Sequence, residues 1–172
     1  MKRPEFAERR RRATAAFASR KIDGLIVSSA PNVRYLTGFT GSSGMALVWQ
    51  GGAVLFTDPR YGIQAAAEVD CAVRVVRGPL YVPLIVAAAR RRLRRLGFED
   101  GRLTLRAYRE LEAGLPLGVS LEPAAGLVEG LRTVKSAAEI EAIRLSVDLN
   151  SQAYKRAMAK VRPGMTESAL AA

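Results

Sequence analysis

The sequence contains no histidine and one cysteine. Without histidine there can be no Ser-His-Asp triad, no Cys-His pair, no HExxH zinc motif and no histidine proton shuttle. The lone Cys71 excludes an internal disulfide and offers no basis for a metal site. Because it lies between Val69 and Val73, we expect a buried, inert thiol. Chemistry performed by this chain alone would have to rest on carboxylates, hydroxyl groups, lysine, tyrosine or that thiol.

Long apolar runs are also missing. The longest lies around residues 84–89, far short of the ~20 residues that span a bilayer. The basic N-terminal segment MKRPEFAERRRR is not followed by an apolar stretch, so it does not match a secretory signal. From these two absences we expect a cytoplasmic protein with no membrane partner.

Acidic residues are scarce relative to basic ones, 16 against 27, and the net charge is +11. Two arginine runs, at residues 9–12 and 90–95, fall in segments with helical patterning. Such runs bind nucleic-acid phosphates in some proteins, and in others form solvated helix faces or a surface complementary to an acidic domain. No RNP-type aromatic motif, helix-turn-helix signature or zinc finger accompanies the charge. Nucleic acid is therefore not the expected partner, and a basic nucleic-acid-binding domain stays an alternative.

What the sequence does contain is an alternation of short apolar runs and helical patterns. We expect helices at 5–20, 59–69, 82–96, 103–114 and 126–132, and strands at 25–27, 45–49, 53–57, 72–76, 97–99 and 119–122. The two apolar runs around Gly51 and Gly52 predict a hairpin, and Asn32 is a candidate N-cap of a short helical turn. The alternation predicts an α/β fold with a mixed sheet flanked by helices.

The pattern changes after residue 132. Ser136 and Glu139 have the spacing of a capping box, and a helix of more than twenty residues is expected to follow. Pro163 and Gly164 end that helix, and a further helix opens near Thr166. We therefore expect an α/β domain at 1–131, then a linker and the first helix of a truncated second domain at 132–172.

Three motifs, in this order, carry a family resemblance. The first is Pro31-Asn32-Val33-Arg34-Tyr35-Leu36-Thr37-Gly38-Phe39 with Gly41-Ser42, followed by Leu55-Phe56-Thr57-Asp58 and Arg60-Tyr61. The second is Leu131-Arg132-Thr133-Val134-Lys135-Ser136-Ala137-Ala138-Glu139-Ile140, and the third is Arg162-Pro163-Gly164-Met165-Thr166-Glu167. Together they resemble the N-terminal domain of the creatinase and Xaa-Pro peptidase family, its linker, and the first loop of its catalytic "pita-bread" fold.

The resemblance implies a ribonuclease-H-like α/β fold for residues 1–131, serving as the non-catalytic N-terminal domain of a prolidase or aminopeptidase P. Members of this family cleave the bond before proline in short peptides, with two divalent metal ions (manganese, cobalt or zinc) held by two Asp, one His and two Glu. None of those ligands is expected within these residues, so no catalytic or metal-binding residue is assigned, and the chain is expected to be inactive alone. The family assembles as homo-oligomers, commonly dimers, through this domain.

The resemblance also implies a contact surface, because the family's loop after the YLTG-like run approaches the active site of a partner subunit. The residues carried over are Asn32, Arg34, Tyr35, Phe39 and Ser42. Arginine can clamp a carboxylate, and an aromatic ring can stack on proline. The alternative interpretation is structural, with Asn32 as a helix cap and Tyr35 in the core. A stand-alone interaction module also stays open as an alternative for the whole chain.

Overall fold

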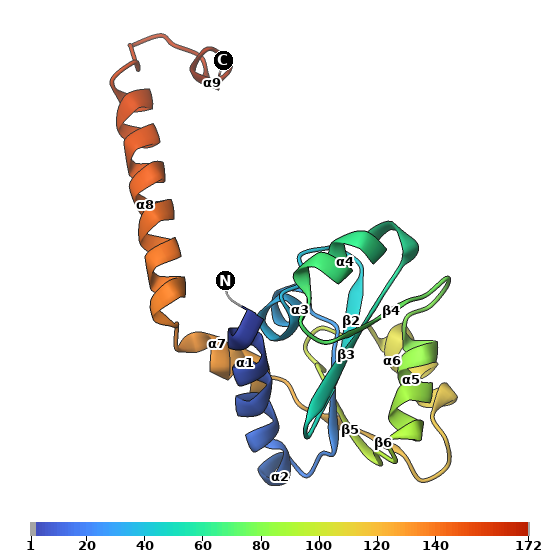
Figure 1. Ribbon diagram of the computed structural model, residues 1–172. Helices are drawn as coiled ribbons and strands as arrows, with labels where there is room; N and C mark the ends of the chain where they lie inside the picture. Colours follow the sequence, from blue (N-terminus) through green and yellow to red (C-terminus); the bar gives the residue numbers. More distant parts are fainter. Residues whose placement is uncertain (1–2, 172) are drawn as a thin grey trace. The chain divides into compact units, whose positions relative to one another are not determined.

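The computed structural model describes residues 3–171 (Figure 1). Its contacts divide the chain into two compact units, Met1–Thr133 and Val134–Ala172, and each is described by itself. The first unit is built around a sheet and contains the motif-rich loops. The second is helical.

The sheet of the first unit has six strands in the order β4-β3-β2-β1-β5-β6. Neighbours pair in parallel, except that β2 runs antiparallel to both β1 and β3, so the sheet is mixed as expected. The β2–β3 hairpin turns at Gln50 and Gly51, with Trp49 paired to Gly52. The strands are β1 (Gly24–Val27), β2 (Gly44–Trp49), β3 (Gly52–Thr57), β4 (Ala72–Val75), β5 (Arg95–Phe98) and β6 (Ser120–Pro123).

Helices cover both faces of this sheet. Those of one face are α1 (Arg3–Ala15), α2 (Phe17–Arg20), α3 (Ala30–Thr37), α4 (Gly62–Glu68) and α7 (Leu127–Thr133), with the 3-10 turn η1 (Pro59–Tyr61). Those of the other face are α5 (Tyr81–Arg90) and α6 (Leu105–Gly114) (Figure 1). The fold is thus a mixed α/β layer flanked by helices, which confirms the predicted class.

The central strand β1 explains why its sequence reads as a continuous apolar run. Leu25 and Val27 face the core under α1 and α3, whereas Ile26 faces the core under α5. A strand covered on both faces has no solvent side and therefore no polar alternation. Full burial of each such side chain contributes roughly 1.5–3 kcal/mol.

Helix α5 ends earlier than its pattern predicts. Arg92 takes a left-handed conformation with φ of 57°, and the Leu93 N–H returns to the Ala88 carbonyl oxygen at 3.2 Å. The prediction of a helix to residue 96 is wrong because Leu93 and Leu96 fit a helical stripe but bury their side chains from the segment after the helix and from β5. Likewise the predicted helix 5–20 is interrupted at Ala16, between α1 and α2.

The second unit contains α8 (Ala137–Met158) and α9 (Glu167–Ala171). The predicted capping box is confirmed: the Ser136 N–H donates to Glu139 Oε2 at 2.9 Å, and the Glu139 N–H donates to Ser136 Oγ at 3.2 Å. No residue of α8 is buried. Its exposed apolar side chains include Ile140, Ile143, Leu145, Val147, Leu149, Tyr154 and Met158.

Candidate functional site at the carboxyl edge of the sheet

The loops that hold the motif residues gather at one edge of the sheet. Strands β1, β3 and β5 end there and β2 begins there, because β1 and β5 pair in parallel and β2 runs antiparallel to both β1 and β3. Open α/β sheets bind their ligands outside the carboxyl ends of the strands. The segments at this edge are 28–32, 38–44, 58–62 and 99–100, and they form the candidate site.

Asn32 is buried, and protein groups occupy its amide. Its Nδ2 donates to Glu99 Oε1 and to Glu129 Oε1, each at 2.6 Å, and its Oδ1 accepts from Arg132 Nη1 at 2.8 Å. The side chain therefore ties α3 to α7 and to the end of β5. In this structure it presents nothing to solvent.

The N-terminus of α3 is satisfied by Glu99, not by Asn32. Glu99 Oε2 accepts from the backbone N–H groups of Ser28 and Ser29, each at 2.7 Å. The helix begins at Ala30, so Asn32 lies inside its first turn and the predicted N-cap role is wrong. A carboxylate here also complements the positive end of the helix dipole.

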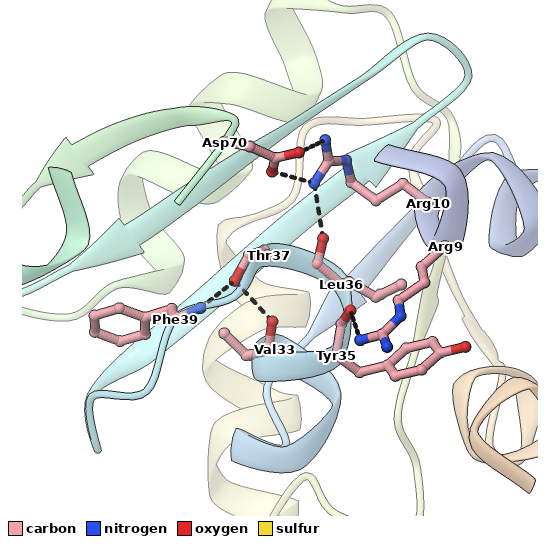
Figure 2. A network of polar contacts seen from close by, with 8 residues as sticks. All are labelled: Arg9, Arg10, Val33, Tyr35, Leu36, Thr37, Phe39 and Asp70. Atoms are coloured by element: carbon pink, nitrogen blue, oxygen red, sulfur yellow. Dashed lines mark hydrogen bonds and ion pairs between the residues drawn. The ribbon is translucent and has the colours of Figure 1, made fainter. Parts of the chain in front are cut away.

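Two arginines of α1 hold the opposite end of α3 (Figure 2). Arg9 Nη1 donates to the Tyr35 carbonyl oxygen at 3.2 Å, and Arg10 Nη1 donates to that of Leu36 at 2.8 Å. These carbonyls lie in the last turn, where helical partners are missing and cations are favoured. Two of the four arginines of the first run, Arg9 and Arg10, thus make hydrogen bonds inside the domain. They do not belong to the solvated or phosphate-binding surface that the sequence allowed.

Tyr35 belongs to the same interior assembly. Its ring lies under the guanidinium of Arg9, whose Cζ is 4.2 Å from the ring centroid, and its hydroxyl donates to the Leu131 carbonyl oxygen at 3.3 Å. The neighbouring Arg34 is exposed. Of these two predicted contact residues, Arg34 is the one available to a ligand in this structure.

Phe39 is buried and anchors the glycine-rich loop. Its N–H donates to Thr37 Oγ1 at 3.2 Å, and its ring meets Tyr61 edge-on with centroids 5.7 Å apart (Figure 2 shows the Phe39–Thr37 contact). Ser42, from the same loop, is exposed and places its Oγ 2.7 Å from the Tyr61 hydroxyl oxygen. The hydrogen bond with Ser42 lowers the pKa of Tyr61 below its ordinary value. Tyr61 thus contacts both Phe39 and Ser42, two of the residues predicted from the sequence.

Charged side chains near the Ser42–Tyr61 pair come from the end of β3 and from η1, and Glu68 of α4 binds the same glycine-rich loop. The guanidinium of Arg60 binds both oxygens of Asp58, at 3.0 and 2.8 Å, and holds the pKa of that carboxyl well below its usual range. Asp58 also accepts from the Arg60 N–H at 3.0 Å and thereby caps the N-terminus of η1. Glu68 accepts from both the N–H and the hydroxyl of Thr40, at 2.8 and 2.6 Å. Burial acts to raise the pKa of Glu68, but these bonds bring it below its ordinary value.

The arrangement offers exposed hydroxyl and guanidinium donors. Among the residues that the structure describes, no three His, Cys, Asp or Glu side chains are grouped to hold a metal ion. A dinuclear centre needs several converging carboxylates or imidazoles. The carboxylates near this edge are instead committed to arginines and backbone donors, so they do not fit the two metal ions that the resemblance implies for the complete enzymes. Within the described part of the chain no helix is long and apolar enough to cross a membrane.

Arg60, Tyr61, Thr40 and Glu68 were not among the candidate residues predicted from the sequence. Arg60 and Tyr61 stood in a quoted motif, but their chemistry shows only when the loop at 38–44 folds against them. A pattern that could have found them is Asp58-Pro59, which predicts a cap and therefore a turn that presents the next two side chains.

The fold is that of an α/β domain with its motif-bearing loops gathered at the carboxyl edge of a mixed sheet. Residues 9–134 match the family model of the creatinase/prolidase N-terminal domain. The chain belongs to that family, and the expected resemblance is confirmed.

Relatives of known name are peptidases. The chain is 33% identical over 156 residues to the uncharacterized peptidase YqhT of Bacillus subtilis, covering 90% of this chain and 44% of that protein. It resembles the structure of an Xaa-Pro dipeptidase from Bacillus anthracis with a TM-score of 0.90 and 26% identity, over 96% of this chain and 46% of that one. The chain therefore spans less than half the length of both relatives.

A shorter structure matches the first unit. The N-terminal domain of the cytoplasmic peptidase PepQ from Mycobacterium tuberculosis is 36% identical, with a TM-score of 0.68, over 72% of this chain and 98% of that chain. A separate N-terminal domain of this kind thus corresponds to most of the α/β unit.

Proposed function

We propose that this chain is the N-terminal, non-catalytic part of an Xaa-Pro peptidase that acts on short proline-containing peptides in the cytoplasm. The observation that carries the proposal is the likeness to the Bacillus anthracis Xaa-Pro dipeptidase, which extends over 96% of this chain but 46% of that one. The peptidase chemistry and its two divalent metal ions (manganese, cobalt or zinc) belong, in this proposal, to a catalytic domain. The residues described here contribute no metal ligand.

Residues 132–172 are, in the proposal, a linker and the first helix of that catalytic domain. The support is physical: α8 exposes apolar side chains from Ile140 to Met158 along its length, and none of its residues is buried. An isolated helix of this kind gains little without a partner for its apolar positions. The rest of the catalytic domain supplies that partner.

The α/β domain serves dimerisation and closes the active site of the partner subunit. The groups that face solvent are Ser42 and the Arg60–Tyr61 pair at the carboxyl edge and Arg34 on the adjoining helix α3, and these make the peptide contacts. Asn32, Tyr35 and Phe39 act from inside the domain by holding α3 and the loop in place. The proposal thereby divides the five family-derived residues into exposed contacts and buried supports.

The first experiment compares the 172-residue chain with the product of its reading frame extended beyond Ala172, each supplied with Mn²⁺ and an Xaa-Pro dipeptide. We expect proline release from the extended product alone. Metal-dependent release by the 172-residue chain, with contaminants excluded, would contradict the non-catalytic role. Light scattering on the same chain is expected to give the mass of a dimer, and a monomer at 100 μM, roughly the upper limit of such work, would contradict the assembly role.

The contact role is tested in the extended product with Ser42→Ala and with Ser19→Ala as the matched control. Ser19 is an exposed serine on α2, remote in the fold from the carboxyl edge. We expect Ser42→Ala to lower kcat/KM about 3- to 10-fold without a change in Tm, as the loss of one polar contact predicts. Equal kinetics for both variants would remove Ser42 from the site.

A further inference from the structure

The opposite, amino edge of the sheet has a different chemistry. Gly24, the first residue of β1, pairs with Trp49 at the end of β2 and with Leu96 of β5, and Arg95 pairs with Ser120 of β6. The C-terminal end of α5 lies at the same edge, because the guanidinium of Arg91 stacks on the Trp49 ring at 3.9 Å. The basic residues that flank these elements are Lys21, Arg90, Arg91, Arg92, Arg94 and Arg95.

Most of these cations have no acidic partner. Asp23 forms an ion pair of 2.8 Å with Arg95. It also accepts hydrogen bonds from the backbone N–H groups of Arg94 and Arg95. The other nearby carboxyl, Glu122, acts on Arg95 as well and accepts from the Ser120 hydroxyl. The cations of this edge that are exposed and make no ion pair with any described residue are Lys21, Arg90, Arg91, Arg92 and Arg94.

The backbone at this edge adds an independent observation. In the described part of the chain, two non-glycine residues have positive φ, Lys21 at 54° and Arg92 at 57°, and both are basic residues of this edge. Each follows a helix, where glycine takes this conformation without strain. The helix dipoles do not explain why Lys21 and Arg92 are basic, since Arg20 and Arg90 already place a cation in the last turn of α2 and of α5. Lys21 and Arg92 therefore place cations at two positions where the backbone conformation favours glycine.

We propose that this amino edge binds the phosphodiester backbone of a nucleic acid. Arginine predominates, and its planar fork matches phosphate oxygens in a bidentate manner. Contact with several phosphates releases counterions and needs neither base-specific nor apolar groups. Binding to a bilayer would require an apolar face beside the charge. The turn before β6 offers one exposed apolar side chain, Leu117, which is not such a face. The edge lies across the sheet from the candidate peptide site, so the inference does not depend on the proposed function.

The test uses the 172-residue chain and a fluorescent duplex DNA of arbitrary sequence, with binding followed by anisotropy over a salt titration. The decisive variant is Lys21→Gly/Arg92→Gly, which removes two cations at positions where glycine suits the backbone. We expect its affinity to fall at least about fivefold at low salt and its log–log salt slope to decrease by about 2. Its Tm should equal or exceed that of the wild type, which separates loss of binding from loss of folding.

The matched control is Arg74→Gln/Arg77→Gln, which removes the same charge from β4 and from the loop after it, toward the other edge. We expect this control to alter duplex affinity less than about twofold. Equal weakening by both double variants would reduce the effect to net charge and overturn the proposal. Absence of duplex binding at low salt would also overturn it, as would binding confined to vesicles containing an anionic lipid.

Discussion

Arg10 and Asp70, sixty residues apart in the sequence, form a two-pronged ion pair, with Nη1–Oδ1 at 2.6 Å and Nη2–Oδ2 at 2.9 Å (Figure 2). The same Nη1 donates to the Leu36 carbonyl oxygen. One side chain of α1 thus connects the end of α3 with the segment that leads into β4. Because the glycine-rich loop begins directly after α3, its position depends on this contact.

Asp70→Asn should destabilise the α/β domain. Both side chains are almost fully buried, at 12% and 11% exposure, and the substitution leaves the guanidinium without its charged partner. We expect the free energy of unfolding to fall by about 2–4 kcal/mol. Urea titration followed by the fluorescence of Trp49, the single tryptophan, measures the change. The control is Glu8→Gln, whose pair with Arg11 is exposed and screened by solvent, so its loss should leave the unfolding midpoint nearly unchanged. Equal losses for the two variants would refute the structural role of Arg10–Asp70.

Asn32→Ala should also lower stability, because it deprives Glu99, Glu129 and Arg132 of a buried partner. We expect a loss of about 2–3 kcal/mol in the same assay. Arg34→Ala, two residues along the same helix but exposed, should change stability by less than about 0.5 kcal/mol. If Asn32→Ala left the unfolding midpoint unchanged, the buried network would not support α3. A direct contact between Asn32 and a ligand would then be the better interpretation.

Gly38→Ala and Gly51→Ala separate backbone strain from steric exclusion. Both glycines have φ of 86°, so each alanine carries a left-handed penalty of about 1–2 kcal/mol. A Cβ on Gly38 would in addition lie 2.6 Å from Phe6 Cε2 and 3.1 Å from the Glu68 carbonyl oxygen, whereas one on Gly51 meets nothing within 4 Å. We expect Gly38→Ala to be less stable than Gly51→Ala by about 1–3 kcal/mol. Similar thermal midpoints would contradict the close packing of α1 against this turn.

Cys71 should react slowly with thiol reagents in the native protein. Burial raises the pKa of its thiol to about 11 from an ordinary value near 9. Since the thiolate is the reactive form, its fraction at pH 8 is roughly 100-fold below that of an unperturbed thiol. We expect alkylation to be slow at pH 8, to accelerate with pH toward 11, and to become fast in denaturant. A native rate at pH 8 equal to the denatured rate would contradict the partly buried environment of the thiol.

Local patterns predicted much of the fold. The β2–β3 hairpin follows from two apolar runs around a glycine turn, and the start of α8 follows from the Ser136–Glu139 box. Both depend on residues close in sequence. The end of α5 did not follow, because Leu93 and Leu96 continue the helical period while the left-handed Arg92 diverts the chain into β5. Periodicity records which side chains are apolar and does not show which core receives them.

The sequence by itself determined the α/β alternation, the family membership expected from three ordered motifs, and the exclusion of histidine chemistry, because each rests on residue identity and short spacing. Tertiary structure alone decided which polar residues are internal. Asn32 meets partners 67 and 97 residues away, and Arg9 and Arg10 turn inward while Arg92 and Arg94 stay in solvent. The reason is physical: a buried polar group requires hydrogen-bond partners, and those partners come together only when distant segments pack.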